Sequence, residues 1–199
     1  MDGYTYPGGK HRRKHGPLGY RSVGEFRDWL RDEFAFRCVY CLEREQWANC
    51  LGHFHIEHFE PVAMNPDREL EYDNLLYSCQ ACNLLKGSQA VPDPLTVFTA
   101  VAVVVQKTGR ILGKTADARR LIEILQLNSP GFRKRRRLMI EILATAAKAN
   151  PALCRELLAF PEDLPDLARL KPPGGNTRPS GIKKTYFVLR RAGRLPETY

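Results

Sequence analysis

The residues best suited to chemistry are the cysteines and histidines gathered between positions 38 and 86. Two C-x-x-C pairs, Cys38 with Cys41 and Cys79 with Cys82, enclose most of this segment. One pair places two thiolates within reach of a single ion, and two pairs complete the closed tetrahedral set that suits structural Zn²⁺. The sequence therefore predicts a four-cysteine zinc site that supplies folding free energy to a small domain.

Two considerations favour metal binding over disulfides. No apolar run follows a basic start at the N-terminus, so we expect no secretory signal and a cytoplasmic protein whose paired cysteines are metal ligands. The alternative, two unrelated redox pairs, lacks the strand–helix setting of such motifs. Cys50 and Cys154 lie outside the pattern and are predicted to be ordinary thiols.

The segment between and after the cysteine pairs carries groups for acid–base and metal chemistry. Glu57 and His58 are adjacent, Asn74 precedes the second pair, and Asn83 and Lys86 follow it. An imidazole titrates near neutral pH and can take a proton from water. Carboxylate and amide oxygens suit a hard cation such as Mg²⁺ or Mn²⁺. Together these groups meet the needs of phosphodiester hydrolysis.

Taken in order, these parts resemble the HNH endonuclease family, also called His-Me finger or ββα-metal nucleases, over about residues 36–87. The family pattern is a C-x-x-C knuckle, an acidic-His-x-x-Pro strand end, a central Asn-Leu and a closing C-x-x-C-[Asn/His]-x-x-Lys. The resemblance implies two strands and a helix around one divalent ion. Glu57 stands where Asp or His is more usual, and Asn83 stands where many members have His. Both retain an oxygen donor.

The resemblance implies a role for each of these residues. His58 is the expected general base, and Glu57 and Asn83 are the expected ligands of the catalytic ion. Asn74 is expected to hold the loop that positions His58, and Lys86 to contact a phosphate.

Two further histidines leave alternatives open. His55 shares a strand face with Glu57, so it either binds or orients a ligand of the ion or is simply packed. His53 is a weaker candidate of the same kind.

A basic run provides a second candidate surface for nucleic acid. Arg133, Lys134, Arg135, Arg136 and Arg137 stand near the start of a helix predicted to follow Pro130. Positive charge at that end opposes the helix macrodipole, which favours a role in binding phosphate. A merely solvated helix face is the alternative. The formal net charge of +9 agrees with an acidic partner.

Other elements must position these residues. Ser22 and Glu25 form a capping box for an amphipathic helix over about 23–34. A β-hairpin is predicted over 95–113, with its turn at Thr108 and Gly109. Three helices should follow: one with apolar residues over 121–125, one from Pro130 to about 149, and a short one from 151. From about 161 the chain is broken by proline and glycine, with a short strand at 185–189.

We expect an α+β protein, a zinc-stapled ββα-metal finger with an N-terminal helix, a β-hairpin and a C-terminal helical extension. The predicted parts are a flexible basic arm (1–20), the finger with its leading helix (21–94), the hairpin and helical extension (95–160) and a basic tail (161–199). No apolar stretch is long enough to span a bilayer, so we expect no membrane partner.

The expected function is metal-dependent endonuclease cleavage of DNA, with RNA left open. One alternative is a non-catalytic zinc module that binds nucleic acid or protein. Another is a nuclease subunit that works only in a complex. Residues 55–61, Leu127-Asn128 and the arginine-rich run resemble, more loosely, the small HNH proteins that accompany ATPases in bacterial anti-phage systems. That resemblance implies an ATPase partner.

Overall fold

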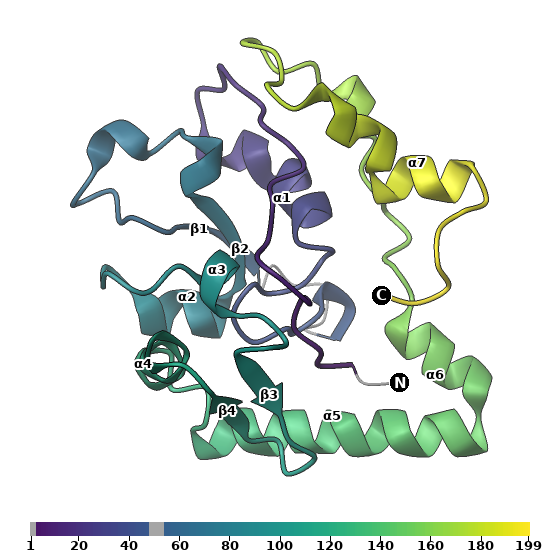
Figure 1. The fold of residues 1–199 in the computed structure, drawn as a ribbon. Coiled ribbons are helices and arrows are strands. Elements are labelled where there is room, and N and C mark those ends of the chain that lie inside the picture. Colours follow the sequence, from purple (N-terminus) through teal and green to yellow (C-terminus); the bar gives the residue numbers. More distant parts are fainter. Residues whose placement is uncertain (1–2, 48–53) are drawn as a thin grey trace.

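The computed structural model describes residues 3–47 and 54–199. Strands β1 (Phe54–His58) and β2 (Leu75–Cys79) pair antiparallel, with His58 opposite Leu75. Helix α2 (Gln80–Lys86) follows β2 directly and packs on both strands, and helix α1 (Arg27–Glu33) contacts β2 (Figure 1). The two strands and the helix of the expected finger are therefore present.

Helix α1 begins where the sequence predicts. The Ser22 side chain accepts a hydrogen bond from the Gly24 backbone, and the Glu25 carboxylate accepts one from the Ser22 backbone at 2.9 Å. This capping box starts a short 3₁₀ turn, Val23–Phe26, that leads into α1. After α1, Ala35 and Phe36 adopt left-handed φ values of 52° and 56°, which end the helix and turn the chain toward the first cysteine pair.

The helical extension also agrees with prediction. It consists of α4 (Ala116–Ile124), α5 (Pro130–Ala149) and α6 (Pro151–Leu158). The Asn150 side chain accepts a hydrogen bond from Leu153 N and so starts α6 immediately after α5 ends. Figure 1 shows α5 running along one edge of the molecule, with α6 turning back from its end.

The predicted hairpin is present but shorter than expected. Its strands are β3 (Val103–Val105) and β4 (Ile111–Gly113), and α3 (Pro94–Val97) takes the place of its first residues. Asp93 caps α3 through its side chain, and a proline at the first position suits a helix start. Gly109 at the turn has a φ of +76°, and a Cβ there would lie 2.3 Å from the Arg133 carbonyl oxygen, so this turn requires glycine.

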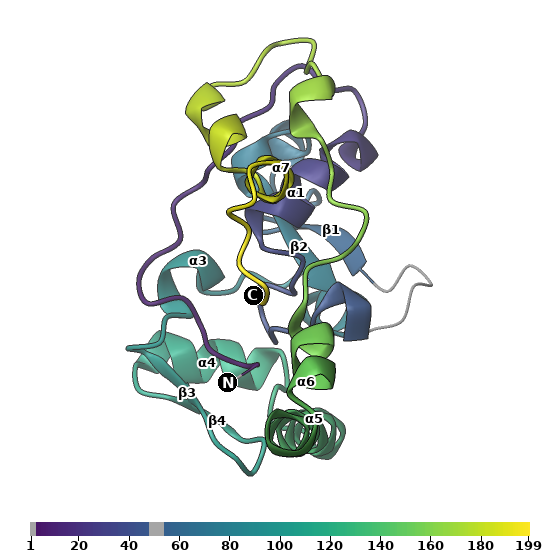
Figure 2. The ribbon, with the colours of Figure 1, turned by 90° about the vertical axis from the view of Figure 1, so that its right-hand side faces the viewer.

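The N-terminal segment differs from the prediction of a flexible arm. Residues 3–20 run beside the body of the molecule, and Tyr4 and Tyr6 are buried (Figures 1 and 2). His15 is fully buried, and its Nε2 lies 2.9 Å from an Asp32 carboxylate oxygen. Pro17 forms an isolated β-bridge with Asn176. A free arm is therefore wrong for these residues, because long-range contacts hold them.

The C-terminal segment is also packed. Residues 186–191 form helix α7 (Tyr186–Arg191) rather than the predicted strand, because the Thr185 side chain caps the Val188 backbone. The Tyr199 ring stacks on Phe160 with centroids 4.5 Å apart. In the view of Figure 2, the C-terminus lies in front of the region around β2, between the level of α1 and that of α6. The division of the chain into four parts stays a prediction.

A shared hydrophobic core joins the finger to its surroundings. Phe26, Trp29, Tyr40, Leu75 and Leu121 all belong to it, so α1, the first cysteine knuckle, β2 and α4 bury side chains together. In the described part of the chain, no helix combines the length and apolarity needed to cross a membrane.

Candidate active site and metal centre

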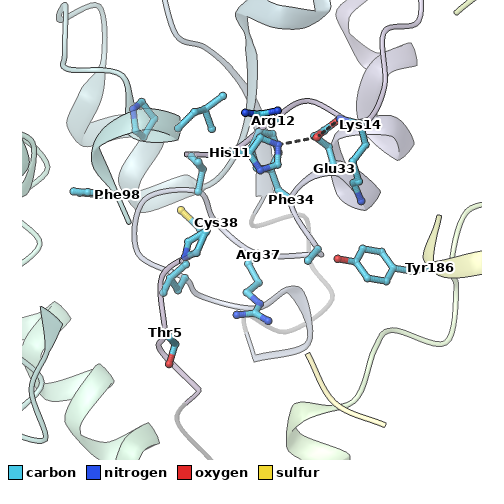
Figure 3. A pocket seen from close by; sticks show the side chains of 16 residues that line it. Thr5, His11, Arg12, Lys14, Glu33, Phe34, Arg37, Cys38, Phe98 and Tyr186 are labelled. Atoms are coloured by element: carbon cyan, nitrogen blue, oxygen red, sulfur yellow. Dashed lines mark hydrogen bonds and ion pairs between the residues drawn. The ribbon is translucent and has the colours of Figure 1, made fainter. Parts of the chain in front are cut away.

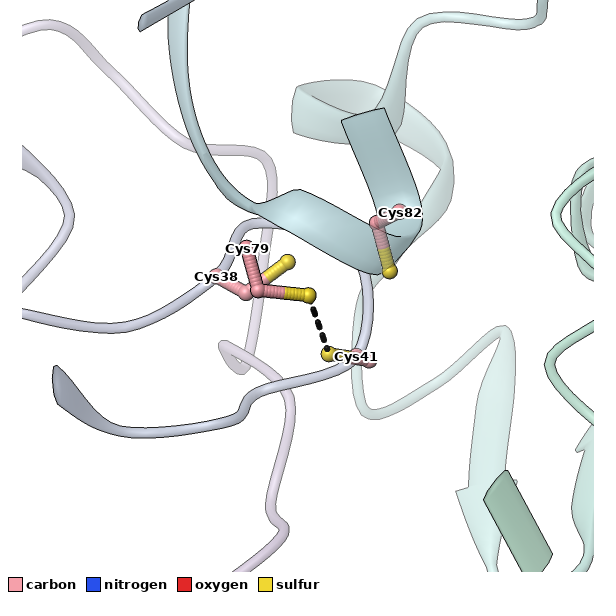
Figure 4. A group of neighbouring side chains, drawn as sticks. All are labelled: Cys38, Cys41, Cys79 and Cys82. Atoms are coloured by element: carbon pink, nitrogen blue, oxygen red, sulfur yellow. Dashed lines mark hydrogen bonds between the residues drawn. The ribbon is translucent and has the colours of Figure 1, made fainter. Parts of the chain in front are cut away.

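The four predicted zinc ligands converge. The sulfur atoms of Cys38, Cys41, Cys79 and Cys82 all lie within 4.8 Å of one another, and all four residues are buried (Figure 4). The sulfurs of Cys41 and Cys79 are 3.6 Å apart. A tetrahedral site with Zn–S bonds near 2.3 Å requires sulfurs about 3.8 Å apart. The cluster fits structural zinc.

Two different local structures present these sulfurs. The first knuckle is a loop closed by a β-bridge between Arg37 and Arg44, with a hydrogen bond of 2.9 Å from Cys38 N to Glu43 O. The second knuckle is a helix start, with Cys79 ending β2 and Cys82 in the first turn of α2. Hydrogen bonds among the four thiols lower the pKa of Cys79 and raise the pKa of Cys41 and Cys82, so without an ion the buried sulfurs share protons with one another.

His58 is half-buried at the end of β1, and its ring is fixed on one side. Its Nε2 lies 3.0 Å from the carbonyl oxygen of Glu69. A carbonyl can only accept, so Nε2 carries the hydrogen. In the neutral ring, Nδ1 is then the nitrogen with a free lone pair.

Asn74 is fully buried and fastens the loop that carries Glu69. Its Oδ1 accepts a hydrogen bond of 2.8 Å from Glu60 N, and its Nδ2 donates to the carbonyls of Glu60 and Arg68, each at 3.1 Å. Its own carbonyl accepts from Phe59 N at 2.8 Å. The loop from the end of β1 to Glu69 is thus held at several points by one asparagine, and that loop supplies the partner of His58.

Glu57 is not open to solvent. It is 4% exposed, the Tyr40 hydroxyl donates to its Oε2 at 2.6 Å, and the Lys86 ammonium lies 2.6 Å from its Oε1. Burial raises the pKa of Glu57, and the charge of Lys86 opposes that rise. Oε2 therefore has a hydrogen-bond partner, whereas Oε1 has the ionic contact with Lys86 and no well-formed hydrogen bond among the described residues.

Lys86 lies inside the domain rather than at a surface that meets phosphate. It is 1% exposed, and its Nζ also donates to the carbonyl of His58 at 2.8 Å. The expected phosphate contact is therefore corrected: in this arrangement Lys86 links α2 to β1 at the Glu57–His58 step.

Asn83 lies one turn before Lys86 on α2 and is half-buried. Its side chain makes no hydrogen bond with any residue in the ranges 3–47 and 54–199, so its oxygen is available to a ligand. The structure joins Glu57, Lys86 and the His58 backbone by direct contacts, and Asn74 acts through the loop. Among the described residues, no hydrogen bond or ion pair joins the side chain of Asn83 to these groups.

The histidines outside the motif are placed differently from one another. His55 is half-buried, and its Nε2 is shielded from solvent without a hydrogen-bond partner among the described residues. Its role as ligand or packing residue stays open. His53 and Cys50 lie outside the described residues.

The basic run on α5 divides into exposed and buried members. Arg133 and Lys134 are exposed, whereas Arg135 pairs with Glu43 and Arg137 pairs with Glu141 at 2.8 Å. Arg136 is only 2% exposed and donates to the carbonyls of Gly109 and Leu127. For Arg136 the predicted contact with nucleic acid is therefore wrong, because its guanidinium joins the hairpin turn to α5.

Two partners of the site were not predicted. Tyr40 lies inside the first C-x-x-C knuckle, so an aromatic residue between two ligands was the available signal. The carbonyl of Glu69 left no signal, because every residue carries the same group.

Arg13 was expected in a free arm, yet it donates to Leu75 O at 2.6 Å, beside the start of β2.

Comparison with known proteins locates the family in this same region. Residues 38–89 match the family model described as HNH endonuclease. No curated protein matches the chain. The matched segment holds both cysteine pairs, β1, β2 and α2 in the expected α+β, zinc-stapled arrangement. Over residues 38–89 the chain is therefore similar to the HNH endonuclease domain.

Proposed function

We propose that this protein is a metal-dependent endonuclease that hydrolyses phosphodiester bonds in DNA, with His58 as the general base. The observation that carries the proposal is the contact between His58 Nε2 and the Glu69 carbonyl. It fixes the tautomer and leaves Nδ1 able to accept a proton from water. General-base assistance of this kind accelerates reactions by about 10²–10⁴-fold.

The rest of the domain supports the orientation of His58. Lys86 holds the His58 carbonyl, and Asn74 holds the loop that supplies Glu69. The backbone and the ring are therefore restrained from separate elements, α2 and the loop before β2. A preorganised base of this kind does not have to be ordered when substrate binds.

Glu57 and Asn83 are the proposed ligands of a hard divalent cation. A buried carboxylate and an available amide oxygen fit Mg²⁺ or Mn²⁺ in donor chemistry. Ion binding sets one requirement on Lys86, whose ammonium lies 2.6 Å from Oε1 of Glu57. The ammonium has to move away from this oxygen, or the carboxylate has to bind Lys86 and the ion together. When bound, such an ion supplies charge stabilisation for the scissile phosphate and the leaving oxygen.

We propose that the exposed cations of α5 bind the phosphate backbone of DNA. Arg133 and Lys134 project from a helix that lies outside the HNH segment, so they would add contacts to DNA held at the finger. Phosphate contacts fix position without reading sequence, which leaves target choice to other parts of the protein or to a partner.

A plasmid-cleavage assay with Mg²⁺ tests the proposal. The zinc-loaded parent should convert supercoiled plasmid to nicked or linear forms, and His58→Ala should lower the rate by at least about 100-fold. Zinc content and unfolding temperature, measured for both proteins, show whether the domain stays folded. Equal cleavage by the His58→Ala protein would remove His58 as the base.

The occupied state of Glu57 favours one alternative, a non-catalytic zinc module for nucleic acid or protein. That function predicts DNA binding without Mg²⁺-dependent cleavage, and no effect of His58→Ala on binding. A second alternative is the one that the looser resemblance implies, a nuclease subunit that cuts only together with a partner ATPase. Cleavage that appears only when a partner ATPase is added would support it.

A further inference from the structure

A cavity of about 480 Å³ lies apart from the proposed catalytic residues. The N-terminal segment, the end of α1, the loop over 35–42, α3 and the start of α7 all contribute to its lining (Figure 3). Glu57, His58, Asn74 and Asn83 do not line it. Its volume is within the range of about 300–1,000 Å³ for small-molecule sites.

Positive charge dominates this lining. Arg12, Lys14 and Arg37 line it together with His11, and Glu33 is the one carboxylate among the described lining residues. Glu33 is already engaged, because its oxygens lie 2.7 Å from His11 Nε2 and accept hydrogen bonds from the backbones of Lys14 and His15 and from the Tyr72 hydroxyl. These contacts lower the pKa of Glu33 to about 2 against the effect of its burial, so it stays charged and occupied.

Two of the cations remain available. The Lys14 ammonium is bound to Asp32 at 2.9 Å. Arg12 is exposed at the rim, and within the described ranges neither it nor Arg37 forms an ion pair. The cavity therefore has two guanidinium groups without an anion.

Arg37 is the more informative of the two. It is half-buried, its Nε is shielded from solvent without a hydrogen-bond partner, and its guanidinium lies 4.7 Å from the centroid of the Tyr199 ring. Burial lowers the pKa of Arg37, which reflects the penalty on an unpaired buried charge. An anion bound in the cavity would remove that penalty and use donors that the protein leaves idle.

Much of the remaining lining is apolar. Phe34, Phe98, Leu95 and Pro94 contribute to it. The Phe34 ring already stacks on His11, with centroids 5.2 Å apart, so this wall offers apolar contact next to the charged end rather than a free aromatic face. We propose that this cavity binds a nucleotide phosphate, with Arg37 and Arg12 holding the phosphate and the apolar wall contacting the base. Both a free nucleotide and the phosphorylated end of a DNA strand present this chemistry.

Calorimetric titration of the full zinc-loaded chain tests the site. The probes are AMP, ATP and a short single-stranded oligonucleotide with or without a 5′ phosphate. Saturable binding is expected, and Arg37→Gln and Arg12→Gln should each weaken it by about 10-fold or more, the effect of losing a hydrogen bond to a charged group. Arg194→Gln is the matched control, an exposed arginine outside the cavity and outside the proposed DNA contacts of α5, and should bind like the parent.

The outcomes separate the sources and the failures. Binding of AMP or ATP assigns a free nucleotide, whereas binding of only the phosphorylated oligonucleotide assigns a strand end. Absence of saturable binding by all probes overturns the proposal, as does an equal weakening in Arg194→Gln, which would indicate general charge attraction. Should Arg37→Gln lose zinc or unfold, Arg12→Gln decides, because its side chain is exposed. None of these readouts depends on nuclease activity.

Discussion

The ammonium nitrogen of Lys86 lies 2.6 Å from a carboxylate oxygen of Glu57, and both side chains are almost completely buried. The same nitrogen donates to the carbonyl of His58, so one lysine on α2 is bound to two consecutive residues of β1. A buried pair of this kind contributes little net stability relative to an apolar pair, but its separation leaves an uncompensated charge. Removal of one partner should therefore cost more than removal of both.

Lys86→Met should destabilise the domain because it leaves the Glu57 carboxylate buried without a counter-ion. We expect the free energy of unfolding to fall by about 3–5 kcal/mol. The double variant Lys86→Met with Glu57→Gln should recover most of that decrease, since it removes both charges. Denaturant unfolding at full zinc occupancy measures both variants. A double variant no more stable than the single one would show that charge pairing is not the cause.

Asn74→Ala should lower cleavage while leaving zinc content unchanged. The substitution removes the hydrogen bonds to Glu60 and Arg68 and frees the loop whose Glu69 carbonyl orients His58. Asn74→Asp should also fail, because a carboxylate accepts from Glu60 N but cannot donate to the two carbonyls. The matched control is Asn65→Ala, since the side chain of the exposed Asn65 bonds the Glu60 carboxylate instead of the loop backbone. Parent-like cleavage by Asn74→Ala would show that Asn74 does not orient His58 through this loop.

Cys82→Ser should release zinc and abolish cooperative unfolding, because the metal supplies much of the folding free energy of a small finger. Cys154→Ser is the matched control: Cys154 is also buried, but its thiol contacts the Leu143 carbonyl outside the cluster. Metal analysis and circular dichroism report the result. Retention of one zinc per chain by Cys82→Ser would exclude a four-cysteine site. Acidification should likewise release the metal, because protons compete for the thiolates.

Charge reversal of exposed residues on α5 should weaken DNA binding while leaving stability unchanged. For Arg133→Glu with Lys134→Glu we expect a shallower dependence of affinity on salt, by about one unit of slope for each DNA phosphate that is no longer neutralised. Arg136→Ala should behave in the opposite way, because it deprives the carbonyls of Gly109 and Leu127 of a donor and lowers stability. Fluorescence anisotropy over a salt series, with thermal unfolding, distinguishes the two. An unchanged salt slope in the exposed pair would remove α5 from the DNA-binding surface.

Residue type and spacing alone located the zinc site and much of the local structure. The cysteine pairs predict their own convergence because an ion imposes the same geometry in any surrounding fold. The capping box at Ser22 and Glu25 and the Asn150 cap of α6 could be predicted because each depends on residues within a few positions of one another. The HNH pattern likewise placed β1, β2 and α2 in the right order.

Only the tertiary structure decided which charged groups face solvent. Arg136 and Lys86 have the composition of phosphate-binding residues, yet both are buried against partners distant in sequence, Gly109 and Glu57. The N-terminal segment has the composition of a free tail, yet His15 is buried against Asp32. A sequence pattern reports short-range preference, whereas burial depends on which distant segments meet. Those contacts therefore determined the orientation of His58, the partners of Glu57 and the lining of the basic cavity.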